Sequence, residues 1–167
     1  MTMDGTIMNI TDERIEVFPP IESIIPHRGT MLLVDAVTSC GDDTLTARAT
    51  VRPDAWYADD DGAMPAWIGI ELMAQSVAAH VSLIAMRAGE RARPGVLLGT
   101  RSYQARLSAF ARGARLTIFV REVLRSEEGH SAYECSIGYD GEQVAQAVIK
   151  VFQPHDFQTF IEGSARA

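Results

Sequence analysis

One long apolar stretch constrains the fold of this 167-residue chain more than any other feature. Residues 66–86 are apolar on almost every side of a predicted helix, with Pro65 before them and Gly89 after them. Proline suits a helix start because its missing N–H needs no partner there, and glycine suits the position just past a helix end. The stretch is long enough to cross a membrane, but it contains Glu71 and His80, which are costly in lipid. We therefore predict a core helix that is surrounded by protein on most sides.

Segments of strand character lie on both sides of this helix in the sequence. Residues 44–51 alternate between apolar and polar side chains, as a half-buried strand does, and Asp140-Gly141 is a strong hairpin signal. A short helical turn at 21–25 ends before Pro26. Two strands, one buried helix and several further strands predict an α+β fold in which an antiparallel β-sheet is wrapped around one long central helix. The predicted strands cover residues 31–39, 44–51, 95–107, 115–124, 131–139 and 143–152.

Length and composition indicate one domain of an ordinary globular protein, with 47% hydrophobic and 22% charged residues. We expect an irregular N-terminal segment over residues 1–18, a single domain over 19–155 and a loose C-terminal tail over 156–167. The two cysteines are too few for a disulfide framework, and no metal or organic cofactor is implied. The first 20 residues lack the pattern of a secretory signal, so we expect a cytoplasmic protein without a membrane partner.

Charge is distributed unevenly along the chain. The formal net charge is −7, yet residues 91–125 contain eight arginines and one acidic residue, Glu122. The overall acidity argues against nucleic acid as a partner. The basic stretch suits a small anionic partner or a phosphate-bearing ligand, and it is equally explained by arginines on the solvated face of strands.

Glu71 is the residue that points most directly to chemistry. It is the only charged residue of the apolar stretch, and steps of four, three and four residues along a helix lead from it to Gln75, Ala78 and Ser82. Such a stripe of polar and small side chains could line a cleft for a long apolar chain, with Glu71 at its mouth. Desolvation there would help the carboxyl group to stay protonated and to act as an acid. The alternative is structural: a carboxylate bound to an arginine or to backbone donors, beside small residues that allow close packing.

Two segments carry a more specific signal. Residues 25–35 read IPHRGTMLLVD, and residues 64–75 read MPAWIGIELMAQ. They resemble the two signature segments of the β-hydroxyacyl-ACP dehydratases of fatty-acid synthesis, a PHR stretch leading into an LLVD-like strand and a turn opening a helix with E-x-M-A-Q. The chain is still more similar to the dehydratase-like proteins of aryl polyene gene clusters, the ApeP type. The resemblance implies a hotdog fold and an activity on (3R)-hydroxyacyl thioesters.

The resemblance also assigns roles to single residues. Glu71 matches the catalytic glutamate of the dehydratases and Asp35 matches an aspartate that we interpret as structural. The N–H groups at the helix start could bind the thioester oxygen as negative charge develops on it. The expected substrate-binding residues are Pro65, Ala66, Trp67 and Gln75. The family's catalytic histidine, in a GHFP loop before the helix, has no counterpart, because residues 56–64 read WYADDDGAM.

The missing histidine leaves one catalytic role open, since dehydration needs a base for the α-proton and an acid for the departing hydroxyl. The candidates are His27, Tyr57, an aspartate from residues 59–61, or a residue of another protein. His27 is the strongest candidate within the chain because it lies in the matched PHR segment. Dehydratases that have their own histidine share that segment, which favours a structural or channel-lining role for His27.

Three functions therefore stay open. The first is a (3R)-hydroxyacyl-ACP dehydratase, acting as a homodimer or with a small hotdog partner. The second is a non-catalytic or half-site hotdog subunit whose partner supplies the histidine. The third is an acyl thioesterase, in which the carboxylate activates water or attacks the thioester. The expected substrate is a thioester of acyl carrier protein or CoA, and the basic stretch favours the acidic carrier protein.

Overall fold

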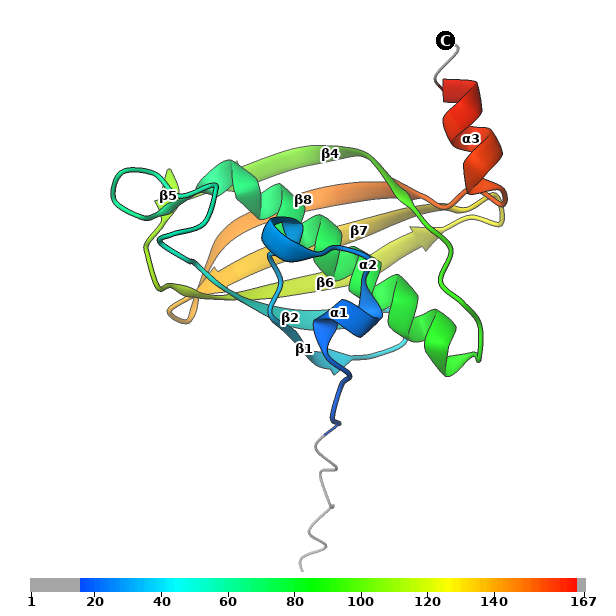
Figure 1. Ribbon diagram of the computed structural model, residues 1–167, viewed down its shortest axis with the longest axis horizontal. Coiled ribbons are helices and arrows are strands. Elements are labelled where there is room, and N and C mark those ends of the chain that lie inside the picture. Colours follow the sequence, from blue (N-terminus) through cyan, green and yellow to red (C-terminus); the bar gives the residue numbers. More distant parts are fainter. Residues whose placement is uncertain (1–15, 165–167) are drawn as a thin grey trace, which may run out of the picture.

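The computed structural model describes residues 16–164 and confirms a sheet wrapped around one central helix (Figure 1). Six antiparallel strands form the main sheet in the order β1-β2-β6-β7-β8-β4, and β3 pairs with β5 in a separate two-stranded ladder. The elements, in chain order, are α1 (Ile21–Ile24), η1 (Gly29–Met31), β1 (Ala36–Cys40), β2 (Thr44–Thr50), β3 (Met64–Pro65), η2 (Ala66–Ile68), α2 (Gly69–Arg87), β4 (Val96–Ala105), β5 (Ala109–Phe110), β6 (Arg115–Arg125), β7 (His130–Tyr139), β8 (Glu142–Phe152) and α3 (Phe157–Ser164).

Alternation of side chains builds the core between the sheet and α2. In β6, Leu116, Ile118 and Val120 are buried, whereas the residues between them face solvent. The predicted turn between β7 and β8 is confirmed, and both Asp140 and Gly141 have positive φ angles there. Such φ angles suit the tight turn of a two-residue hairpin.

The central helix α2 lies across one face of the sheet, as predicted (Figure 1). Leu72, Met73 and Val77 are buried in the core. The segment Ala66–Arg87 meets the length and composition of a membrane span, but 61% of its most apolar window is buried inside the domain. Its first residues form the 3-10 turn η2 rather than regular helix, and Trp67 in that turn is 63% exposed.

The strand predicted over residues 31–39 begins only at Ala36. The backbone N–H groups of Leu33 and Val34 donate to the side chain of Gln75 at 3.0 and 3.3 Å, so they are not available for a strand ladder. Gly29–Met31 forms a 3-10 turn instead.

The expectation of a loose tail over residues 156–167 is wrong for its larger part. Residues Phe157–Ser164 form α3. The Asp156 carboxylate accepts hydrogen bonds from the Thr159 N–H at 3.0 Å and the Thr159 hydroxyl at 2.9 Å, which caps the helix start. Residues 165–167 lie outside the described residues, as do residues 1–15 of the expected N-terminal segment.

The two edges of the main sheet differ. The β1 edge is five residues long and interrupted by a bulge between Val37 and Ser39. The β4 edge is ten residues long, pairs with β8 on one side, and leaves Leu97 and Leu98 exposed. A long free edge of this kind is a template for pairing with another chain.

Candidate active site

A cleft of about 540 Å³ lies between α1, the residues that follow it, α2 and residues 92–97. One wall is a row of small and apolar side chains of α2 that includes Ala74, Val77 and Ala78, followed by Val81 and Ser82. Ala78 and Ser82 of the predicted stripe therefore line the cleft. Its lining is more apolar than polar and suits an extended hydrocarbon chain.

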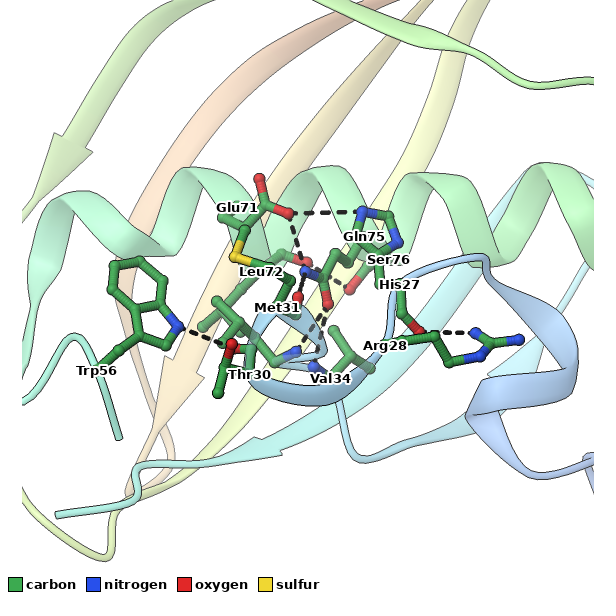
Figure 2. A network of polar contacts seen from close by, with 11 residues as sticks. His27, Arg28, Thr30, Met31, Val34, Trp56, Glu71, Leu72, Gln75 and Ser76 are labelled. Carbon is green, nitrogen blue, oxygen red and sulfur yellow. Dashed lines mark hydrogen bonds and ion pairs between the residues drawn. The ribbon is translucent and has the colours of Figure 1, made fainter. Parts of the chain in front are cut away.

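Glu71 and His27 lie side by side in this cleft (Figure 2). The His27 Nε2 atom is 3.7 Å from Glu71 Oε1, and the two side chains are 29% and 35% exposed. The His27 Nδ1 atom is buried and has no hydrogen-bond partner among the described residues. Nε2 is therefore the ring nitrogen that faces Glu71, and it is the atom through which His27 could exchange a proton in the cleft.

The exposure of Glu71 differs from the sequence expectation. We expected desolvation of this carboxylate, but a third of the side chain is open to solvent in the single chain. Desolvation at this position therefore requires a bound ligand or a second protein chain over the cleft.

Gln75 connects Glu71 to the segment that precedes β1 (Figure 2). Its Nε2 group donates to Glu71 Oε1 at 2.8 Å and to the Met31 carbonyl at 2.7 Å. Its Oε1 atom accepts from the backbone N–H groups of Leu33 and Val34. Gln75 is fully buried and is not among the cleft-lining residues, so in the single chain it orients Glu71 instead of touching a ligand. The four-residue spacing in the sequence is the signal for this contact.

The other expected substrate-binding residues lie at the helix start, outside the lining of the cleft. The Ala66 N–H donates to the Ser108 carbonyl at 2.9 Å, which removes it as a donor to a thioester oxygen. Pro65 pairs with Ala109 in the β3–β5 ladder. Trp67 presents its side chain to solvent, and its N–H is the remaining predicted donor at the helix start.

The loop that lacks the histidine holds its own residues in structural contacts. Tyr57 is buried, and its hydroxyl accepts a hydrogen bond from the Arg52 N–H at 3.0 Å. The Asp59 carboxylate accepts from the backbone N–H groups of Asp61 at 3.0 Å and Ala63 at 2.9 Å, as in an Asx-type turn. Of the candidates for the second proton-transfer group, His27 is the one that the structure brings to Glu71.

Two features of the site could not be predicted from the sequence. Arg28, next to His27, donates from Nη1 to the carbonyls of Ile25 and His27, both at 2.7 Å, and so fixes the backbone that presents the imidazole. Trp56 donates from its indole N–H to the Thr30 carbonyl at 2.8 Å and ties the acidic loop to the same segment (Figure 2). Side-chain bonds to backbone carbonyls leave no pattern in a sequence. Among residues 16–164 no group of three or more potential metal ligands is present.

Comparisons with known proteins agree with this geometry. The model of the ApeP-like family, described as ApeP dehydratase, matches residues 19–162. A chain of the dehydratase heterocomplex ApeI:P from Xenorhabdus doucetiae is 25% identical, with a TM-score of 0.81 over 87% of this chain and 97% of that chain. No curated protein gives a significant sequence match.

More distant solved structures share the fold. A hypothetical thioesterase with coenzyme A from Streptococcus pneumoniae is 18% identical, with a TM-score of 0.56 over 71% of this chain and 87% of that chain. The PaaI protein of the phenylacetic acid degradation operon of E. coli is 13% identical, with a TM-score of 0.55 over 71% of this chain and 78% of that chain. These similarities support the hotdog architecture.

Proposed function

The chain belongs to the ApeP-like dehydratase family, and from this premise we propose that it works as a (3R)-hydroxyacyl-ACP dehydratase with Glu71 as a proton-transfer residue. The substrate would be a 3-hydroxyacyl thioester carried by acyl carrier protein or CoA in the cytoplasm. The apolar cleft along α2 would hold the acyl chain, with its reacting carbons beside Glu71 and His27.

The observation that carries the proposal is the 3.7 Å approach of His27 Nε2 to Glu71 Oε1 in a cleft. Dehydration breaks the C2–H and C3–O bonds, forms the C2=C3 double bond and releases water. One group must take the C2 proton while another protonates the departing C3 hydroxyl. His27 would act as the base through Nε2 and Glu71 as the acid, and a bound acyl chain would exclude water from the pair.

The thioester oxygen gains negative charge when the C2 proton leaves, and a preorganised donor would stabilise it. The Trp67 N–H at the start of α2 is the candidate, because the Ala66 N–H is bonded to Ser108. The positive end of the helix dipole adds to this stabilisation.

The test is mass spectrometry of a 3-hydroxyacyl-ACP incubated with the purified protein, with Glu71→Gln and Glu22→Gln compared. Glu22 is an exposed acid of α1 that also lines the cleft and forms no ion pair with His27, which makes it a matched control. Loss of water that requires Glu71 and not Glu22 would support the proposal. Full activity in Glu71→Gln would reject it, and release of free thiol in place of water would identify a thioesterase.

A half-site subunit is the second candidate, and two observations favour it. The similar ApeI:P structure is a dehydratase heterocomplex, and the loop before α2 lacks the family histidine. The free β4 edge would be the docking surface. Residues 91–121 contain arginines and no acidic residue, so pairing of two copies along β4 would bring like charges together. A different hotdog chain with an acidic edge would avoid this repulsion.

Mixing distinguishes the two candidates. A half-site subunit would be inactive alone and would gain water-loss activity with a hotdog partner that carries the GHFP histidine. Size-exclusion chromatography would then show a mixed complex. Glu71-dependent activity of the chain alone would reject the half-site function.

A further inference from the structure

Strand β4 contains an irregularity opposite the start of the central helix. Arg101 pairs with Val148 and Gln104 pairs with Gln146, so Ser102 and Tyr103 together face the single residue between these partners. Ser102 has a φ angle of 53°, in the left-handed region that a non-glycine residue seldom adopts. This is a β-bulge, and bulges redirect a side chain out of the regular alternation.

The side chain redirected by the bulge is Tyr103. Its hydroxyl donates a hydrogen bond to the carbonyl of Ala66, in the 3-10 turn η2 that opens α2. The same hydroxyl lies against Gly69, the first residue of α2, where an added Cβ would overlap it. The contact therefore requires the bulge on one side and a glycine on the other.

The segment that follows Tyr103 also forms hydrogen bonds with the η2 turn and with the strand before it. The Ser108 carbonyl accepts the Ala66 N–H at 2.9 Å, and β5 pairs with β3 immediately before the turn. Both backbone polar groups of Ala66 are thus bonded to residues 103–108. Figure 1 shows the start of α2 at the end of the molecule where β5 lies.

We propose that Tyr103 is a positioning residue for the reaction, because its hydroxyl fixes the turn from which the Trp67 N–H and, one helical turn later, Glu71 project. This rests on the proposed function. Tyr103 itself does not line the cleft. Burial raises the pKa of Tyr103, so its hydroxyl stays protonated and continues to donate at neutral and mildly alkaline pH.

The hydroxyl can be separated from the packing of the ring. Tyr103→Phe keeps the ring between β4 and η2 and removes only the hydrogen bond to Ala66. Tyr139→Phe is the matched control, because Tyr139 is a second half-buried tyrosine of the same sheet, at the end of β7.

The experiment has one readout that does not depend on activity. The chain has two tryptophans, so in a Trp56→Phe background Trp67 alone reports on the turn. We expect Tyr103→Phe to change the Trp67 emission and to speed amide hydrogen exchange over residues 67–70 by about fivefold, as expected for loss of a hydrogen bond worth ~1 kcal/mol. Tyr139→Phe should change neither signal.

The kinetic readout tests the link to chemistry. Tyr103→Phe should lower kcat for dehydration about tenfold with KM within about twofold, since small displacements at the reacting centre affect turnover before binding. Unchanged exchange and emission, or changed signals with a wild-type kcat, would overturn the positioning role. An inactive wild-type chain would instead reject the proposed function, and the kinetic comparison would then be made with the partner-bound complex.

Discussion

Two networks of polar side chains attach to α2, and both contain a histidine. Toward the helix start, His27, Glu71 and Gln75 form a partly exposed network in the cleft (Figure 2). Further along, His80 is fully buried and its Nδ1 atom lies 2.9 Å from the Tyr133 hydroxyl. The first network contains a carboxylate and is open to a ligand, whereas the second is a closed pair between α2 and β7.

The difference in exposure between the two networks indicates different roles, catalysis for the first and stability for the second. A proton-transfer group must reach the substrate, and the His27–Glu71 pair meets this condition. Burial lowers the pKa of His80, so this ring stays neutral near pH 7 and serves as a hydrogen-bonding partner in the core. We therefore expect substitutions in the first network to change turnover and substitutions in the second to change the free energy of unfolding.

The largest effect is expected for His27→Asn. Loss of the base should lower kcat/KM for dehydration by about 100-fold or more, the usual contribution of a general base. The unfolding midpoint in urea should stay within the error of the wild type, because the His27 side chain is partly exposed and its Nδ1 forms no hydrogen bond in the described structure. A large loss of stability with retained turnover would show that His27 has a structural role and not a catalytic one.

His80→Ala tests whether the buried His80–Tyr133 pair stabilises the fold. Removing the buried ring leaves a cavity and a Tyr133 hydroxyl without its partner, so the free energy of unfolding should fall by about 2–4 kcal/mol. Urea denaturation followed by circular dichroism measures this change. Tyr133→Phe, which removes only the hydroxyl, should cost about 1–2 kcal/mol. Dehydration by the folded fraction should be unchanged in both variants, and a loss of kcat at full folding would contradict the separation.

The sequence predicts much of the fold because the relevant signals are local. The alternation in residues 44–51, the Asp140-Gly141 turn and the apolar stretch from residue 66 each depend on the chemistry of neighbouring positions. The expected strand from residue 31 fails for a long-range reason. Gln75, more than 40 positions away, takes the N–H groups that a strand ladder would need.

The site was predictable to a smaller extent. Glu71 is identifiable because a single carboxylate in an apolar helix needs an explanation, and the spacing to Gln75 implies their contact. The contact of His27 with Glu71 depends on how the segment before β1 folds onto α2, which no periodicity encodes. The contact of Tyr103 with Ala66 is further removed, since it requires a bulge at Ser102 that breaks the alternation of β4.

The pH dependence of the free energy of unfolding tests the structural role of His80 by itself. Its pKa is lowered from 6.5 in the folded state by burial, so below pH 6.5 the unfolded chain binds a proton that the folded chain resists. The free energy of unfolding should therefore be at its full value above pH 6.5 and fall below it, by up to about 1.4 kcal/mol per pH unit. Urea titrations at pH 7.5, 6.5 and 5.5 should give a smaller slope for His80→Gln than for the wild type. Equal slopes would exclude His80 as the source of the pH dependence of the free energy of unfolding.

The smallest effects are expected at the surface, where the arginines at the two ends of α2 differ in their pairing. At the His80 end, Arg125 bonds to Glu122 and Arg121 to Glu134, both through side chains of the sheet. Near the helix start, Arg106 forms one ion pair, in which its Nη1 atom lies 3.7 Å from Glu142 Oε2 and both side chains are about 70% exposed. Arg115 forms no ion pair among the described residues. Exposed charges of this kind are free to attract an acidic partner.

Charge reversal at the helix-start end should therefore weaken binding of an acidic acyl carrier protein. We expect Arg106→Glu and Arg115→Glu each to raise the Kd by about three- to tenfold at low salt, and the difference from wild type to shrink at 0.5 M NaCl, where charges more than a few ångströms apart are screened. Fluorescence anisotropy of labelled carrier protein measures the Kd. Arg125→Glu, at the paired end of the helix, is the control and should leave the Kd within about twofold. Equal weakening by all three variants would mean that net charge alone governs carrier binding. Unchanged affinity would mean that Arg106 and Arg115 only face solvent on the strands and do not bind the carrier protein.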